Sequence, residues 1–278
     1  MSYPNLEQDR PFRHYKLKHR VIAWISLHLF DTVTYTVRHG LLTGRKWKGG
    51  LGWVPALFSP GIMTAEHQFW CGLNLRGMTV YDVGAFQGLL TLFFASRAKT
   101  VVSFEPNTQN HKRLIENLIL NGIQNVEVRK VGVGSRRETR RMVGSPLMLG
   151  GASVEEKAVA ELLRAGVGTV VEEIPIITLD EEIPQTGLPA PDFIKIDIEG
   201  WEIEALRGAR NTLELHKPAL FLEMHGQTIR EKRRKVVEIV TYLWETNYRR
   251  ICHIETGTTI TPENSSVAME GHLYCQAT

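Results

Sequence analysis

The chain has 278 residues, of which 43% are hydrophobic and 23% charged, and its formal net charge is +3. These values are close to those of ordinary globular proteins, and they exclude a disordered, collagen-like or disulfide-dense chain. The three cysteines, Cys71, Cys252 and Cys275, are far apart and form no CxxC pair. They predict core thiols in a reducing compartment, with one reactive thiol as the alternative.

The first fifty residues form a basic extension. They contain nine Lys and Arg against three acids, so the remainder of the chain carries a net charge of −3. An apolar run, Val21 to Phe30, follows the basic residues and ends at Asp31. A helix that spans a bilayer needs about 20 apolar residues, so this run predicts a helix that packs on the folded domain or, alternatively, lies in a lipid interface. We predict a cytoplasmic protein with a partly helical extension over residues 1–62, in which residues 10–50 are the candidate for a peripheral contact with membranes or anionic lipid.

Residues 63–278 have the pattern of one α/β domain. Glycines and prolines at 40–61 predict a loop that leads into it. The predicted strands are 79–83, 100–104, 126–131, 192–198 and 219–224, and the predicted helices are 88–98, 107–121, 202–215 and 229–245. Strands that alternate with helices imply a parallel, doubly wound sheet.

Two segments depart from this alternation. Residues 134–191 predict an elaborated connection that holds a basic cluster, a helix at 154–164 and a strand at 170–177. Residues 249–277 contain two β-rich runs around a polar turn at 261–266, which predicts a terminal antiparallel hairpin. The sheet is therefore expected to be mostly parallel.

The turn after the first strand is the expected ligand site, because ligands of open α/β sheets bind at the carboxyl ends of the strands. It runs from Asp82 to Gly88. Gly84 permits close backbone approach, Gly88 permits a tight entry into the helix, and Asp82 can accept a hydrogen bond from a ligand amine or hydroxyl. The glycines that a dinucleotide fingerprint needs are replaced by Phe86 and Leu89, and no Lys-Ser/Thr pair follows Gly88. NAD and nucleoside triphosphates are therefore disfavoured.

An acid at the end of the second strand points to a ribose. Glu105 lies 21 positions after Gly84, the distance at which an acid reaches ribose hydroxyls in this architecture. S-adenosylmethionine carries a ribose, no pyrophosphate and a cationic amino acid end that suits Asp82. Alternatively, Asp82 caps its own turn and Glu105 is a solvated loop acid. The predicted cofactor-binding residues are Asp82, Gly84, Ala85, Phe86, Gln87, Gly88, Glu105, Pro106, Lys130, Val131 and Asp197.

Five blocks of sequence resemble the FkbM family of S-adenosylmethionine-dependent methyltransferases. They are YDVGAFQGLLT at 81–91, FEPNTQNHKRLIENLILNG at 104–122, ITLDEEI at 177–183, DFIKIDIEGWEIEALRGA at 192–209 and FLEMHG at 221–226. The fourth block contains the K-x-D-x-E-G-x-E signature at Lys195, Asp197, Glu199, Gly200 and Glu202. The family usually has Asn where this chain has Phe86. The resemblance implies a class I methyltransferase fold, with a Rossmann-like, mostly parallel sheet of seven strands that here follows an N-terminal helical extension.

The resemblance also implies O-methylation of a hydroxyl on a sugar, glycolipid or polyketide-like natural product. Transfer to a hydroxyl needs alignment with the methyl group and a base that removes the proton. The candidate catalytic residues are Asp197 and Glu199 after the fourth strand and Glu223 and His225 at the end of the fifth. Successive strand residues alternate sides, so one of Asp197 and Glu199 is expected to face the acceptor.

Each of these side chains has a structural alternative. Asp197 would bind the cofactor or a helix N-terminus, Glu199 would cap a helix, and His225 would be an ordinary loop histidine. Lys195 is expected to pair with a buried acid, and Asp180 to cap a short helix. The histidines have no HxH or HxxxH spacing, so no metal site is predicted, although Mg²⁺ held by carboxylates near Asp197 and Glu223 is the alternative.

The expected partner is a small-molecule or glycan acceptor. The arginine cluster at 136–141 predicts a solvated face, with an anionic group of the acceptor as its alternative ligand. The modest net charge of +3 does not indicate a surface that binds nucleic acid. Two other functions are considered: a non-catalytic domain that binds S-adenosylmethionine, which the departure at Phe86 keeps open, and a nicotinamide-dependent oxidoreductase, which the missing glycines weaken.

Overall fold

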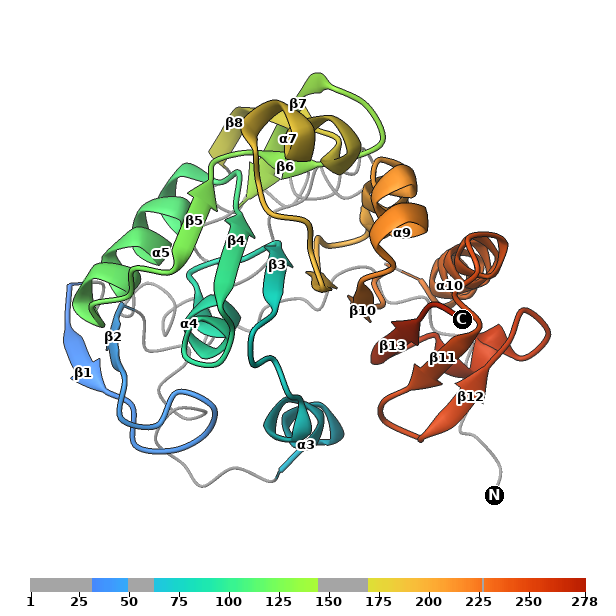
Figure 1. The fold of residues 1–278 in the computed structure, drawn as a ribbon, viewed down its shortest axis with the longest axis horizontal. Coiled ribbons are helices and arrows are strands. Elements are labelled where there is room, and N and C mark those ends of the chain that lie inside the picture. The colour runs from blue at the N-terminus through green and yellow to red at the C-terminus, as the bar shows by residue number, and fades with distance from the viewer. Residues whose placement is uncertain (1–31, 50–62, 145–169, 227) are drawn as a thin grey trace.

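A central sheet of eight strands carries the fold of this computed structural model, which describes residues 32–49, 63–144, 170–226 and 228–278 (Figure 1). The strand order is β12-β11-β13-β10-β9-β3-β4-β5. These strands are β3 (Thr79–Val83), β4 (Thr100–Phe104), β5 (Val126–Arg129), β9 (Phe193–Ile196), β10 (Ala219–Glu223), β11 (Arg250–His253), β12 (Thr258–Ile260) and β13 (His272–Gln276). Five neighbouring strands, β5, β4, β3, β9 and β10, are parallel, and β13, β11 and β12 add an antiparallel edge.

The sheet has one strand more than the seven expected, and the difference lies at its antiparallel edge. The C-terminal segment forms three strands rather than a two-stranded hairpin, because a turn at Gly257, with a φ of 67°, divides its first β-rich run into β11 and β12. A short 3-10 helix, η2 (Ser265–Ala268), occupies the predicted polar turn and leads to β13.

Helices cover both faces of the sheet. They are α3 (Ala65–Gly72), α4 (Leu89–Ala95), α5 (Thr108–Leu120), α7 (Leu179–Thr186), α8 (Glu202–Arg207), α9 (Arg210–His216) and α10 (Ile229–Glu245). Side chains alternate along each buried strand, so Tyr81 and Val83 of β3 pack in the core beneath α7 to α10, whereas Val80 packs in the core with α3, α4 and α5. This three-layer arrangement is the predicted doubly wound α/β fold.

The helix starts follow their capping residues. The Asn107 side chain accepts hydrogen bonds from the first turn of α5, and Thr228 does the same for α10. The helix predicted at 202–215 is instead two helices, α8 and α9, which separate near Gly208. Asp180 accepts from the backbone N–H groups of Asn211 and Thr212, so it caps α9 rather than the helix α7 in which it lies.

The connection at 134–191 contributes a second, three-stranded sheet. Its strands are β6 (Gly132–Val133), β7 (Glu138–Gly144) and β8 (Val170–Ile177), in the order β6-β8-β7. The arginine cluster lies here, and Arg136, Arg137 and Arg140 all form ion pairs with glutamates of the chain. This pairing agrees with a solvated face. The helix predicted at 154–164 lies outside the described residues.

The described part of the N-terminal extension is a β-hairpin of β1 (Thr34–Thr36) and β2 (Lys46–Lys48), which lies beside α5 (Figure 1). The predicted loop at 40–61 thus contains a strand. Backbone N–H groups of β2 donate to Asn117 of α5 and to Asn121 at its C-cap, and Trp47 is buried. The helix predicted at 21–30 lies outside the described residues, and among the helices that the structure describes none has the length and hydrophobicity of a membrane-spanning segment.

Candidate functional site

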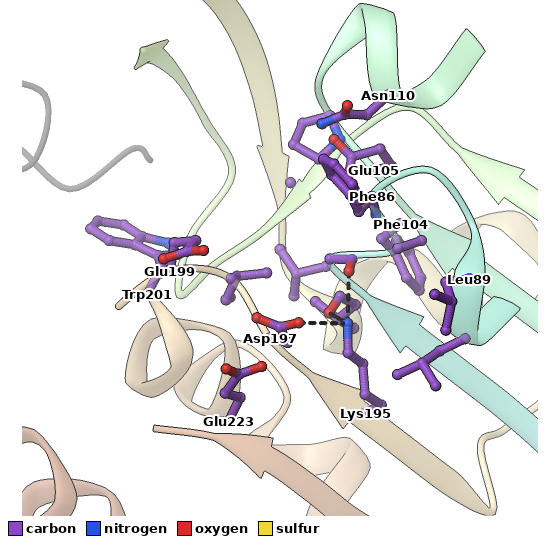
Figure 2. A pocket seen from close by; sticks show the side chains of 18 of the residues that line it. Phe86, Leu89, Phe104, Glu105, Asn110, Lys195, Asp197, Glu199, Trp201 and Glu223 are labelled. Carbon is purple, nitrogen blue, oxygen red and sulfur yellow. Dashed lines mark hydrogen bonds and ion pairs between the residues drawn. The ribbon is translucent and has the colours of Figure 1, made fainter. Parts of the chain in front are cut away.

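A cavity of about 560 Å³ opens at the carboxyl ends of β3, β4, β9 and β10. Ligand sites of this fold class lie at such strand ends, and the volume is within the range of small-molecule sites. In Figure 2, Phe86, Glu105 and Asn110 lie on one side of the pocket and Glu199 and Trp201 on the other, with Asp197 and Lys195 between them. The small sheet adds Met142, Ile174 and Ile176 to the wall, and the N-terminal hairpin adds residues 39–42.

The turn after β3 owes its shape to two glycines. Gly84 has a φ of 80°, and a Cβ atom on it would overlap the carbonyl oxygen of Asp197. The close approach that Gly84 permits is therefore an approach to the chain's own backbone. Gly88 has a φ of 94°, and a Cβ atom there would overlap the side chain of Leu114 on α5. Both positions favour glycine because L side chains rarely adopt such φ values.

Phe86 lies in the same turn with a φ of 50°, a left-handed conformation in which Asn is more common than bulky residues. Its backbone N–H donates to Glu105 at 2.8 Å. The second carboxylate oxygen of Glu105 accepts from the N–H of Asn107 at 2.9 Å. Glu105 thus joins the turn after β3 to the start of α5 at the cavity wall. Burial raises the pKa of Glu105 to about 7, although these hydrogen bonds oppose the shift.

Asp82 is fully buried, and its side chain bonds to other side chains inside the protein. Its carboxylate accepts a hydrogen bond from Thr91 at 2.6 Å and lies 3.3 Å from the Nζ atom of Lys195, its register partner on β9. Lys195 also lies 3.3 Å from Asp197. Burial works to lower the pKa of Lys195, but the charges of Asp197 and Asp82 outweigh it and raise the pKa. The expected pairing of Lys195 with a buried acid is thus present, and Asp82 does not line the cavity.

The four predicted catalytic residues meet around one imidazole. The Nε2 atom of His225 lies 3.7 Å from Asp197, 3.8 Å from Glu199 and 3.6 Å from Glu223. The Nδ1 atom of His225 is hydrogen-bonded at 2.9 Å to Glu202, which is buried. Asp197, Glu199 and Glu223 line the cavity, whereas His225 is not one of its lining residues.

The charges of this cluster shift its pKa values. Burial works to lower the pKa of His225, but the bond to Glu202 and the neighbouring carboxylates outweigh it and raise the pKa to about 10. Burial raises the pKa of Glu199 to about 7. Burial also acts to raise the pKa of Asp197, but the charges of Lys195 and His225 hold it below its usual value.

The structure divides the predicted cofactor-binding residues into two groups. Those that line the cavity are Gly84, Ala85, Phe86, Glu105, Pro106, Val131 and Asp197. The others, Asp82, Gln87, Gly88 and Lys130, support the surrounding elements. The carbonyl of Gln87 accepts from Asn117, and Lys130 pairs with Glu172 at 3.6 Å.

Three neighbours of the cluster were not among the predicted site residues. Glu202 was part of the signature but had no assigned role, because its place at the start of a predicted helix does not reveal the bond to His225. His272 lies 3.8 Å from Glu223 and 2.6 Å from Glu255. Only the antiparallel pairing of β10 with β13, in which Glu223 and His272 are register partners, brings it there. The third is Trp201, whose ring carries Arg140 at 4.7 Å from the ring centroid.

The cavity fits S-adenosylmethionine. Glu105 offers a buried carboxylate at the end of β4, where a ribose is expected in this architecture. Apolar side chains such as Phe86, Leu89 and Val131 line the adjoining wall and suit a purine ring. The carboxylates of Asp197 and Glu223 lie farther along the cavity and suit a cationic end.

Comparisons with known proteins identify a family for this chain. A family model described as the methyltransferase FkbM domain matches residues 82–250, more than half of the chain. The AMB antimetabolite synthetase AmbE of Pseudomonas aeruginosa is 28% identical over 178 residues, which cover 53% of this chain and 8% of the synthetase.

Solved structures show similar folds at low identity. Methyltransferase FkbM from Methylobacillus flagellatus KT is 20% identical, with a TM-score of 0.47 over 72% of this chain and 43% of that protein. A Streptococcus mutans protein in complex with SAH is 12% identical, with a TM-score of 0.43 over 77% of this chain and 96% of that protein. The chain therefore spans a small part of the synthetase and less than half of the Methylobacillus protein. On the family match, the chain belongs to the FkbM methyltransferase family.

Proposed function

We propose that this enzyme methylates a hydroxyl oxygen of a sugar, glycolipid or polyketide-like acceptor. One observation carries the proposal: Asp197, Glu199 and Glu223 line the same cavity as the predicted cofactor residues, at the ends of β9 and β10. Methyl transfer to a neutral hydroxyl requires a proton acceptor beside the oxygen, and a carboxylate can fill that role.

The residues of the chain align the reactants and remove one proton. S-adenosylmethionine, when bound, supplies a methyl group already activated by the sulfonium charge. The walls of the cavity hold the acceptor oxygen in line with that methyl group, which is the main catalytic requirement. As the hydroxyl loses its proton to a carboxylate, its oxygen keeps the electron pair of the O–H bond and can bond to the methyl carbon. The carbon–sulfur bond that breaks would leave its electron pair on sulfur.

Hydrogen bonds and ion pairs narrow the choice of proton acceptor. His225 is not one of the residues that line the cavity, and its Nδ1 atom is bonded to Glu202. Asp197 is paired with Lys195 at 3.3 Å. Glu199 and Glu223 are the two carboxylates whose side chains are about 40% exposed at the cavity, so they are the proposed proton acceptors.

The wall opposite the main sheet supports an acceptor with apolar faces as well as hydroxyl groups. Met142, Ile174 and Ile176 form a small apolar cluster of their own at the cavity. Trp201 adds an aromatic ring on the side of Glu199 (Figure 2). Sugar rings and polyketides both combine apolar faces with hydroxyl groups.

Phe86, on which the non-catalytic alternative depended, preserves the shape of the cofactor turn. It adopts the left-handed conformation that suits the Asn usual in the family, and it bonds to Glu105 through its backbone. The departure therefore replaces a side chain without breaking the turn, which supports an active enzyme.

Transfer of a trideuterated methyl group tests the proposal. The full chain would be incubated with labelled S-adenosylmethionine and a panel of sugars, glycolipids and polyketides, and products located by mass spectrometry and NMR. We expect label on an acceptor oxygen. Glu199→Gln and Glu223→Gln separately test the base, whose loss should lower turnover by about 10²–10⁴-fold while S-adenosylhomocysteine still binds. Label on nitrogen or carbon would overturn the assignment.

A further inference from the structure

The strongest unassigned feature is the set of ligand-type atoms around His225. Asp197, Glu223 and His225 each offer one such atom, and the three atoms lie within 4.8 Å of one another. We propose that these three side chains bind a divalent cation at the acceptor end of the cavity. The role of this cation, though not its binding, rests on the proposed O-methylation.

The spacing of the atoms suits a shared cation better than hydrogen bonds. The Nε2 atom of His225 is 3.7 Å from Asp197 and 3.6 Å from Glu223, beyond ordinary hydrogen-bond length. Metal–oxygen and metal–nitrogen bonds of about 2.0–2.2 Å place two ligands of one ion about 3–4 Å apart. The two separations from Nε2 fall in that interval, and all three ligand atoms lie within 4.8 Å of one another.

Glu202 fixes the direction of the imidazole. It is 1% exposed and bonds the Nδ1 atom of His225 at 2.9 Å, while the same oxygen accepts from the N–H of Gly200 at 2.9 Å. In the metal-bound state Nδ1 keeps its proton and Nε2 gives up its own, so that the Nε2 lone pair faces the carboxylates of Asp197 and Glu223 and the cation replaces the charge of that proton. A carboxylate that orients a metal-binding histidine in this way is a common arrangement around metal sites.

The two carboxylates are oriented as well. Asp197 directs one oxygen to Lys195 and the other to His225. Glu223 directs one oxygen toward His272 and the other toward His225. Each carboxylate therefore presents one oxygen to the cluster and has the other anchored by a different basic side chain.

The donor set limits the kind of ion. Two carboxylate oxygens and one imidazole nitrogen suit Mn²⁺ or Zn²⁺, and they leave coordination positions for water or an acceptor hydroxyl. A hydroxyl bound there would be held and polarised beside Glu199. With Glu223 bound to the cation, Glu199 is the proton acceptor of the two carboxylates proposed above. The site would thus bind acceptors through an oxygen that reaches the cation.

Direct binding of Mn²⁺ alone tests the site without any measurement of activity. The full chain, freed of metal with a chelator, would be titrated with Mn²⁺ while the signal of the free ion is followed by electron paramagnetic resonance. We expect one ion per chain. Affinity should fall at least tenfold in Glu223→Gln and in His225→Ala, and by about 10–100-fold in Glu202→Gln.

His216→Ala, at an exposed histidine of α9, is the matched control and should bind Mn²⁺ as the parent does. Retained binding of S-adenosylhomocysteine shows that each variant is folded. Equal Mn²⁺ binding by the parent and a Glu223→Gln/His225→Ala double variant would overturn the site. An unchanged rate of O-methylation by the metal-free enzyme would overturn the role of the cation but leave O-methylation standing. Mn²⁺ binding together with methylation on nitrogen would leave the cation site standing but overturn O-methylation.

Discussion

The Nζ atom of Lys195 donates to the carbonyl oxygen of Gly84 at 2.7 Å. Through this bond a strand-end side chain of β9 holds the turn that follows β3, and its charge lies between Asp82 and Asp197. Lys195 is therefore a positioning residue that connects the cofactor turn to the acceptor end of the cavity.

Replacing Lys195 by Met should destabilise the protein strongly. The change leaves Asp82, which is fully buried, without its cationic partner, and breaking a buried pair in this way costs about 3–5 kcal/mol. Urea unfolding measures the loss. Lys232→Met is the matched control, because Lys232 pairs with the exposed Glu270 and such surface pairs contribute about 0–1 kcal/mol. Similar losses in the two variants would contradict the structural role of Lys195.

Gly84→Ala should cost both stability and cofactor affinity, because the new methyl group overlaps the carbonyl of Asp197. Gly77 provides a control with the same φ of 80° and no heavy atom within 4 Å. Gly77→Ala carries only the cost of the left-handed conformation, about 1–2 kcal/mol. Gly84→Ala should lose about 1–3 kcal/mol more through overpacking, as measured by urea unfolding. Equal losses would show that the backbone at Asp197 moves aside freely.

Glu105→Ala should weaken binding of S-adenosylhomocysteine by about 1.5–3 kcal/mol, the range for hydrogen bonds to a charged group. The expected cause is loss of the acceptor for the ribose hydroxyls at the end of β4. Isothermal titration calorimetry measures the change, with Glu127→Ala on the neighbouring strand β5 as the control. Unchanged affinity in Glu105→Ala would remove this residue from the cofactor site.

Glu105 should also make stability depend on pH. Its pKa is raised from 4.5 to about 7 in the folded protein, so between these values the folded state keeps a proton that the unfolded state has released. The stability that this proton provides is therefore present at low pH and is lost as pH rises toward 7. Urea unfolding at pH 5 and pH 8 should show Glu105→Gln becoming more stable relative to the parent as pH rises. A pH-independent difference between the two proteins would contradict the raised pKa.

The order of the central elements could be predicted because their signals are local. Asn107 caps α5 at the predicted position, and α10 has the predicted bounds of 229–245. Apolar runs with a residue buried on each face identify β3, β9 and β10. The strand β7 was not predicted, because its adjacent arginines, Arg140 and Arg141, resemble a solvated loop rather than the alternation of a half-buried strand.

The roles of individual site residues depended on pairings that no local pattern contains. Asp82 was expected to meet a ligand, but its register partner is Lys195, 113 positions away in the chain. The four catalytic candidates were identified from strand ends, and the structure brings them together around His225. Glu202, the partner of His225, became evident only once the start of α8 and the residues after β10 were brought together.

The small three-stranded sheet forms a part of the cavity wall that is separate from the strand ends of the central sheet. Met142, Ile174 and Ile176 form their own core cluster and line the cavity without belonging to the strand ends that hold Glu105 or Asp197. A larger or smaller side chain on β7 or β8 therefore reshapes the space for an acceptor while the cofactor turn keeps its glycines and its acid. Substitutions in this wall can therefore change which acceptor fits without altering the turn that holds the cofactor.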